Sequence, residues 1–239
     1  MISAFFHAVV YNPLYNGLVF LVSLIPTHDM GLAVIALTLI VRIVLFPLSR
    51  RAVQSQIEMK KIAPEVEAVK KKFKNNSPEQ AQAIFALYKE RGVHPFSGFA
   101  LQLIQLPILI GLYIVFLRSG FPNVDQALLY PFVHAPSAIN MHFLGFIDMG
   151  ARHNIILAAL AALTQLMYAR LSMGPRGTET AGEATLSGDM AKSFDLQIRY
   201  ILPGMVGVIA YTIPAAAPLY YLTSNLFMIG QEYFSGRRF

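Results

Sequence analysis

The fold of this chain is decided by residues 31–48, GLAVIALTLIVRIVLFPL. A helix that crosses a lipid bilayer needs about 20 consecutive, mostly apolar residues, and this stretch contains a single charge, Arg42. It predicts a first transmembrane helix within the segment 26–49. The composition agrees, because 55% of the 239 residues are hydrophobic and 13% are charged, whereas soluble domains carry about 25% charged residues.

Three further stretches are apolar enough to span a membrane: 96–117, 155–171 and 200–234. The last is too long for one helix and contains Pro214 and Pro218. Because proline lacks the helix N–H donor and clashes with the preceding turn, this stretch predicts two helices, near 200–213 and 215–234, joined by a tight hairpin. The expected fold is an all-α integral membrane protein with a core of five transmembrane helices, the last four of them within 93–239.

The basic residues are distributed unevenly between the loops, which predicts the orientation. The loop 50–91 contains ten Lys or Arg, whereas the outer loop 119–154 contains one. The segment 172–199, rich in small and polar residues at its start, contains three, and Arg237 and Arg238 lie next to the C-terminal residue. Since Lys and Arg accumulate on the cytoplasmic side, we expect a cytoplasmic C-terminus, an N-terminus outside and a flexible cytoplasmic linker at 172–199. No transit peptide is visible, which favours a bacterial cytoplasmic membrane.

Residues 1–25 are apolar but admit more than one interpretation. Asn12, Pro13, Asn16 and Gly17 interrupt the apolar run, so we prefer an interfacial helix on the outer face of the membrane. A sixth span is the alternative. No basic region precedes the run and no small-residue cleavage site follows it, which disfavours a signal peptide.

Residues 50–92 are predicted to form a cytoplasmic helical hairpin. Apolar residues recur at helical spacing on both sides of a turn at 75–78. Ser77 is the expected N-cap of the second helix and Gly92 its end, while Pro64 should kink the first helix. The hairpin is either a structural element whose apolar stripes pack together or a docking arm for a partner or nascent chain. Nucleic-acid binding is disfavoured, because five glutamates are interleaved with the basic residues.

Arg42 is the most informative residue of the first span. It lies six residues before Leu48, and therefore about 9 Å inside the expected cytoplasmic boundary. Burying an arginine at the centre of a membrane helix costs on the order of 3 kcal/mol. No Asp or Glu lies within 30–48, 96–117, 155–171 or 200–229 to offset that cost.

Two interpretations of this arginine remain. Its side chain can snorkel to the interface, or it can lie in a hydrated polar site where its charge is available to a substrate carboxylate, which we favour. The candidate neutral companions are Thr38, Gln102, Gln105, Thr164, Gln165, Thr212, Tyr220, Tyr221 and Asn225.

Catalytic and metal-binding signals are missing from the sequence. The chain has no cysteine, which excludes disulfides, thiolate metal sites and a cysteine nucleophile. It also has no H-E-x-x-H, G-x-S-x-G or phosphate-loop motif. His134, His142 and His153 share the outer loop, but their spacing is irregular and no acidic cluster accompanies them. We therefore expect a protein that is not an enzyme and has no cofactor or metal.

Seven motifs follow one another along the chain: VRIVLFPLSRRA (41–52), IAPEVEAVKKKF (62–73), LYKERGVHPFSG (87–98), QLPILIGLY (105–113), FLGFIDM (143–149), AALTQLMYARL (161–171) and LYYLTSNLFMIGQE (219–232). In this order and spacing the sequence resembles the YidC family of bacterial membrane insertases, which has relatives in mitochondria and chloroplasts. The resemblance covers most of the chain. It implies a five-helix core with a cytoplasmic hairpin, an N-terminal interfacial helix and a hydrophilic groove that is open to lipid and cytoplasm.

The resemblance also implies roles for particular residues. Arg42 matches the groove arginine of the family, Thr38 a groove position one turn earlier and Gln165 a groove glutamine. Tyr221 matches an aromatic residue that contacts substrate, and Tyr220 lies beside it in the sequence. Further candidates for the polar lining are Gln102, Gln105 and Asn225. The implied substrates are small membrane proteins, often with an acidic outer tail. The implied partners are membrane lipid, the Sec translocon, and the ribosome or signal recognition particle system.

The sequence departs from the family pattern in several places. No large periplasmic domain and no lipobox cysteine are present, His94 replaces a usual Asn, and 99–101 replaces a Cys-x-Pro run. The chain ends a few residues after the last helix, which leaves ribosome binding by a basic tail open. An anion transporter is the main competing hypothesis, although no internal inverted repeat supports it. A membrane scaffold without insertion activity is another.

Overall fold

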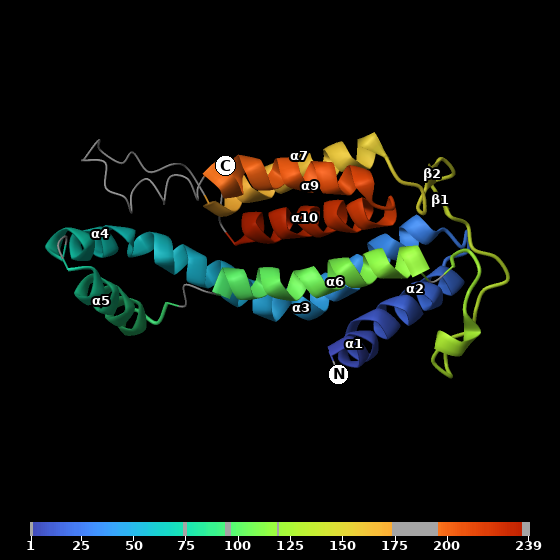
Figure 1. Ribbon diagram of the computed structural model, residues 1–239, viewed down its shortest axis with the longest axis horizontal. Coiled ribbons are helices and arrows are strands. Elements are labelled where there is room, and N and C mark those ends of the chain that lie inside the picture. Colours follow the sequence, from blue (N-terminus) through green and yellow to red (C-terminus); the bar gives the residue numbers. More distant parts are fainter. Residues whose placement is uncertain (1, 74–75, 94–96, 119, 174–195, 236–239) are drawn as a thin grey trace. The chain divides into compact units, whose positions relative to one another are not determined.

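The computed structural model describes residues 2–73, 76–93, 97–118, 120–173 and 196–235, and its main elements are helices (Figure 1). The first half contains α1 (Ile2–Phe6), a π-helical segment (His7–Tyr11), α2 (Asn12–Leu24), α3 (Met30–Lys61), α4 (Ala63–Lys72), α5 (Ser77–Glu90) and α6 (Ser97–Arg118). The second half contains a 3-10 turn (Gln126–Leu128), β1 (His142–Phe143), β2 (Ile147–Asp148), α7 (Ile155–Met173), a π-helical segment (Gln197–Ile201), α9 (Leu202–Thr212) and α10 (Ala216–Phe234). The helices predicted from the apolar stretches are therefore confirmed, as is the break next to Pro214. The predicted linker 172–199 lies mostly outside the described residues.

Three of the described helical stretches are long and apolar enough to cross a membrane: Ala4–Leu24, Met30–Lys61 and Ile155–Ser172. A shorter apolar helix spans Gln105–Arg118. The protein is thus a largely helical membrane protein. The core of five spans stays a prediction.

The N-terminal helix is continuous through the residues that interrupt its apolar pattern. A π-helical segment (His7–Tyr11) directly precedes α2, and Pro13 lies in the first turn of α2. Pro13 has no N–H to donate within this continuous helix, and the π-helical segment directly before α2 marks where the hydrogen-bond pattern of the helix shifts. By length and composition this helix is able to span a membrane. The interfacial placement of 1–25 therefore stays a prediction beside the alternative of a sixth span.

The chain divides into two compact units, residues 1–43 with 107–239, and residues 44–106. In the first unit α7 packs along both α9 and α10 (Figure 1). Small residues allow close approach of α7 and α9, because a Cβ added at Gly207 would lie 3.1 Å from Cβ of Ala162. Small side chains at helix contacts are typical of membrane bundles, where close packing replaces the hydrophobic driving force.

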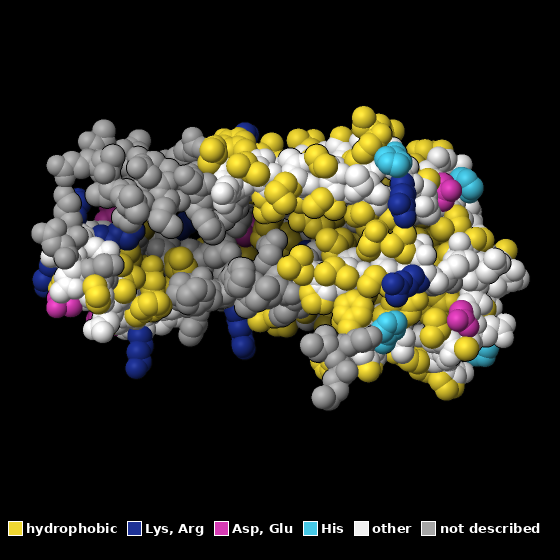
Figure 2. Space-filling model, in the orientation of Figure 1, with side chains coloured by type: hydrophobic (Ala, Val, Ile, Leu, Met, Phe, Trp, Pro, Cys, Tyr) yellow, Lys and Arg dark blue, Asp and Glu magenta, His cyan; other side chains and the backbone are white. Residues whose placement is uncertain are grey.

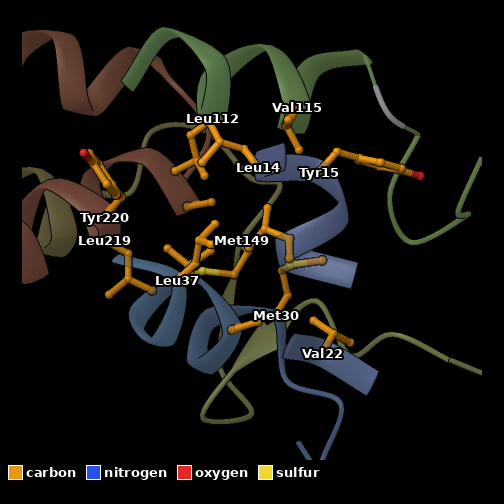
Figure 3. Packing of buried hydrophobic residues seen from close by; sticks show 14 of the residues in the cluster. Leu14, Tyr15, Val22, Met30, Leu37, Leu112, Val115, Met149, Leu219 and Tyr220 are labelled. Carbon is orange, nitrogen blue, oxygen red and sulfur yellow. The ribbon is translucent and has the colours of Figure 1, made fainter. Parts of the chain in front are cut away.

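A hydrophobic core lies at the end of the first unit that carries the loop between α6 and α7. Its labelled members include Tyr15 from α2, Met30 from α3, Leu112 from α6, Met149 from the loop and Leu219 from α10 (Figure 3). These elements come from distant parts of the sequence. The core therefore joins them into one unit.

Backbone hydrogen bonds fasten this loop to the helices. The N–H of Met30 donates to Asn140 O (2.9 Å), and the N–H of Ala216 donates to Met149 O (3.1 Å). Asn16 is buried in α2 and accepts a hydrogen bond from the N–H of Tyr130 (2.6 Å). The loop thus covers one end of the helical unit.

Large apolar side chains are exposed on the helices of this unit, as expected for surfaces that face lipid. Figure 2 shows hydrophobic side chains over much of the visible face. Exposed examples are Ile43, Ile156, Val208 and Leu226.

The second unit contains α4 and α5, which pack against each other. Arg91 Nη2 lies 2.8 Å from Glu65 Oε2, and Gln80 Nε2 donates to Lys70 O at 3.0 Å. These contacts pair the start of one helix with the end of the other, which makes the pair antiparallel. The position of this pair relative to the membrane stays a prediction.

Local details of the second unit differ from expectation. α3 continues to Lys61 without a break at 49–50, and Pro64 lies in the first turn of a new helix, α4, instead of kinking one. The N-cap of α5 is Asn76, whose side chain accepts from the N–H of Glu79. Ser77 is therefore the first helical residue, because Asn76 is an equally good cap. Gly92 follows the helix with φ of 64°, as expected for its C-terminal end.

Candidate functional site

The guanidinium of Arg42 lies inside the first unit and contacts α10. The residue is 6% exposed, and its Nε donates to Oγ of Ser224 at 2.7 Å. Its Nη2 donates to the same oxygen. Among the described residues Arg42 forms no ion pair. A charge is thus held inside the protein by a neutral hydroxyl, 182 positions away in the sequence.

On α3, α7 and α10, buried apolar residues near the start of each helix are followed by buried polar ones. On α3, Thr38 and Arg42 follow a run of buried apolar residues, and on α10 the same is true of Ser224. At 1.5 Å per residue, Arg42 lies about 18 Å from the start of α3 and Ser224 about 12 Å from the start of α10. The structure therefore has a polar cluster beyond the hydrophobic core. Its buried members are Thr38, Arg42, Thr164, Gln165, Ser224 and Asn225.

Hydrogen bonds hold the polar cluster. The Nδ2 of Asn225 donates to Oγ1 of Thr164 at 3.4 Å, which links α10 to α7. The hydroxyl of Thr38 donates to Val34 O of its own helix at 2.6 Å. The first bond connects two helices, whereas the second leaves the hydroxyl oxygen of Thr38 with acceptor capacity toward the interior.

Three tyrosines surround the cation. The phenol groups of Tyr220, Tyr168 and Tyr221 lie close enough to Arg42 to interact with it electrostatically. Tyr220 is buried and Tyr221 is partly buried. Figure 3 shows Tyr220 at the edge of the hydrophobic core, on α10 beside Leu219. The buried cation is therefore accompanied by phenol groups as well as by neutral polar side chains.

A buried carboxylate is also present on α10. Glu232 is 0% exposed. It lies three residues beyond the stretch 200–229, which contains no Asp or Glu. It follows Ser224 by eight residues, which is about 12 Å along a helix. That separation explains why Glu232 does not pair with Arg42.

The structure separates the predicted site residues into two groups. Arg42, Thr38, Gln165, Tyr220 and Tyr221 all belong to the first unit, and so does Asn225. Thr212 is exposed and donates to Ile209 O at 2.8 Å, so the prediction that it accompanies Arg42 is wrong. Gln105 is half-buried in the second unit, and the side chain of Gln102 lies outside the described residues. The roles of these two glutamines stay predictions.

Sequence reasoning missed two neighbours of Arg42. Ser224 was overlooked although it follows Tyr220 by four residues, and Tyr168 was overlooked although it follows Gln165 by three residues. The available signal was the helical period, since residues three or four apart share a face. Among the described residues no group of three or more His, Asp or Glu side chains is arranged to hold a metal ion.

The chain was compared with known proteins. A family model described as 60Kd inner membrane protein matches residues 20–239. The "Membrane protein insertase YidC" of Clostridium tetani is 32% identical over 207 residues, which cover 86% of this chain and 81% of that protein. The one from Fusobacterium nucleatum is 30% identical over 227 residues, with coverage of 94% and 96%. The "Membrane protein insertase MisCA" of Bacillus subtilis is 29% identical over 234 residues, with coverage of 96% and 78%.

A solved structure is also similar. The "Active YidC insertase crystal structure with the first transmembrane domain resolved" matches with a TM-score of 0.61 and 27% sequence identity. The match covers 94% of this chain but only 46% of that chain, so this protein spans just under half of the solved one. With a family model that matches nearly the whole sequence and relatives of similar length, the chain belongs to the YidC family of membrane proteins.

Proposed function

We propose that this protein is a membrane protein insertase and chaperone, which inserts small membrane proteins into a bacterial cytoplasmic membrane and helps them fold. The names of its relatives support this proposal. Insertion moves an apolar segment from water into lipid and breaks no covalent bond. It therefore requires a path for polar groups, and no nucleophile or cofactor.

The observation that carries the proposal is the buried charge of Arg42. Its guanidinium has a neutral hydroxyl as its partner and no carboxylate among the described residues. Keeping a cation inside a membrane protein is costly, and a substrate carboxylate that binds it would offset part of that cost. An acidic group in the outer tail of a substrate is such a ligand.

The proposed mechanism has two simultaneous parts. Thr38, Gln165, Tyr220 and Tyr221 line a hydrophilic groove around Arg42, with Asn225 as further lining, and the groove holds the polar tail transiently. The apolar segment of the substrate meanwhile moves along the lipid-open side of the groove into the bilayer. Hydrophobic transfer drives this step at about 0.8 kcal/mol per buried CH₂. The membrane potential adds about 2.3 kcal/mol per charge per 100 mV.

The proposed partners follow from this role. They are nascent membrane proteins and lipid and, for substrates delivered during translation, the Sec translocon and the ribosome or signal recognition particle system. In this proposal the α4–α5 pair lies in the cytoplasm, where its basic surface is available to a delivery partner. Insertion proceeds either alone or together with the translocon.

The test is insertion into liposomes that contain only the purified protein. A single-span substrate with an acidic outer tail is added, and its protection from external protease is measured for wild type, Arg42→Ala and Arg42→Lys. Loss of a charge-assisted hydrogen bond is worth about 1.5–3 kcal/mol, so we expect insertion by Arg42→Ala to fall roughly tenfold or more, with partial activity for Arg42→Lys. Arg152→Ala, which removes an exposed arginine of the outer loop, is the matched control. Equal insertion by all four proteins would refute the role of the buried cation.

A further inference from the structure

The hydrogen bonds of Arg42 occupy one particular edge of its guanidinium. Both Nε and Nη2 donate to Oγ of Ser224. A hydroxyl oxygen has two lone pairs, so one serine is able to accept both bonds. This places Ser224 at the side edge of the planar group, where a side-on carboxylate would otherwise bind.

The other edge of the guanidinium has a different environment. Among the described residues, no acceptor binds Nη1 of Arg42. A guanidinium binds a carboxylate with two parallel hydrogen bonds, and with the side edge taken this pairing uses Nη1 and the second N–H of Nη2. The geometry thus leaves the end edge of the guanidinium, formed by Nη1 and Nη2, as the edge that binds a carboxylate.

The position of Ser224 is itself held by α10. The adjacent residue, Asn225, donates to Thr164 on α7, and Ser224 is fully buried. The hydroxyl is therefore on a packed helix and not on a mobile loop. An acceptor in such a place restricts the long arginine side chain before any ligand arrives, which reduces the entropy lost on binding.

We propose that Ser224 is a positioning residue, which holds the side edge of the Arg42 guanidinium so that its end edge faces a substrate carboxylate. This inference rests on the proposed function, because it assigns a role within insertion of acidic substrates. The carboxylate then binds the Arg42 guanidinium end-on and with two hydrogen bonds, and Ser224 selects this binding mode.

The test is a double-mutant cycle in the liposome assay. Two substrates are used that differ only in one outer-tail residue, Asp or Asn, and the ratio of their insertion rates is the readout. The proteins are wild type, Ser224→Ala, Arg42→Lys and the double variant, with Thr223→Ala as the matched control. The Thr223 hydroxyl donates to Leu219 O on the same helix, whereas the hydrogen bonds of Arg42 go to Ser224. Ser224→Ala removes a single oxygen, and insertion of the Asn substrate reports whether each variant is folded.

We expect Ser224→Ala to lower the Asp-to-Asn ratio about three- to tenfold, in line with loss of hydrogen bonds to a charged group. In the Arg42→Lys background, where the fork-shaped group is gone, Ser224→Ala should change the ratio less than about 1.5-fold, because the two residues act through one contact. Thr223→Ala should leave the ratio unchanged.

Two results would overturn the proposal, and they are distinguishable. If wild type prefers the Asp substrate but Ser224→Ala lowers the ratio equally in both backgrounds, Ser224 has only a structural role and the proposed function stands. If wild type inserts neither substrate better than protein-free liposomes, the proposed function fails and this inference fails with it.

Discussion

The carboxylate of Asp29 accepts a hydrogen bond from the N–H of Leu144, 115 positions later in the chain, at 2.9 Å. Its other oxygen accepts from the N–H groups of Gly31 (2.7 Å) and Leu32 (3.1 Å), at the start of α3. One side chain thus caps a membrane helix and fixes the β1–β2 turn of the loop between α6 and α7. A negative charge is favourable at a helix N-terminus, so both functions suit an aspartate.

Asp29→Ala should lower the free energy of unfolding by about 1–3 kcal/mol, since it removes the cap and a buried acceptor. Asp29→Asn should have a smaller effect, because its amide oxygen keeps the cap while its NH₂ group faces the N–H of Leu144. The measurement is thermal unfolding in detergent, with Asp148→Asn on the exposed part of the turn as the control. Unfolding midpoints that are equal for all variants would contradict this account of Asp29.

Asn16 links α2 to the loop between α6 and α7. Its Oδ1 accepts from the N–H of Tyr130 and its Nδ2 donates to Leu128 O at 2.9 Å. Asn16→Leu should leave two backbone groups without partners and lower stability by about 2–4 kcal/mol. Limited proteolysis between α6 and α7 is the measurement, and faster cleavage is expected. Asn12→Ala, one turn earlier in α2, is the control, and equal cleavage of both variants would show that Asn16 does not hold the loop.

Close packing of α7 and α9 depends on Gly207. A larger side chain there would meet Ala162 and the backbone oxygen of Ala158. Gly207→Leu should therefore cost about 1–3 kcal/mol, as overpacking does. Gly204 lies on the same helix with no described atom within 4 Å of an added Cβ, so Gly204→Leu should be neutral or stabilising. The thermal midpoints of the two variants are compared in detergent, and similar losses for both would indicate an effect of helix backbone and not of packing.

The predicted orientation is testable because the chain has no cysteine of its own. Phe85 on α5 and Phe132 in the loop between α6 and α7 are both exposed, so a single cysteine at either position should react readily. In intact bacterial cells a membrane-impermeant maleimide should label Phe132→Cys, and it should label Phe85→Cys only after the cells are opened. The reverse pattern would invert the topology.

The N-terminal helix is tested in the same way. If it lies on the outer face, Ala4→Cys is labelled in intact cells, as we expect. Labelling only after lysis would show that Ala4–Leu24, which is long enough to span, crosses the membrane as a sixth helix. Leu24→Cys, next to the start of α3, is the control and should be labelled from outside in either case.

The helices were largely predictable because each depends on local composition. The apolar stretches gave α6, α7 and α10 within a few residues, since length and hydropathy decide which segments enter lipid. The cap of α5 was misplaced by one residue, because Asn76 and Ser77 are both good caps and the choice depends on the turn before them. Pro64 was expected within a helix, but the first turn of a new helix accommodates it better.

The candidate site was predictable only in part. Arg42 is conspicuous in sequence as one charge among apolar residues, but Ser224 is not. A hydroxyl in a membrane helix often bonds to its own backbone, as Thr38 does with Val34 and Thr223 with Leu219. The sequence does not distinguish these hydroxyls from one that binds another helix.

By itself, the sequence determined that the chain is a helical membrane protein, where most of its helices lie, and that one apolar stretch carries a single cation. These properties follow from the cost of placing polar groups in lipid, because the composition of each segment by itself decides whether that segment can enter the bilayer. Only the tertiary structure decided which hydroxyl accepts the hydrogen bonds of Arg42. It also decided which loop packs on the end of the bundle through its hydrogen bond to Asp29. Those contacts join residues more than 100 positions apart, and they exist only after helix packing brings their groups within hydrogen-bond distance.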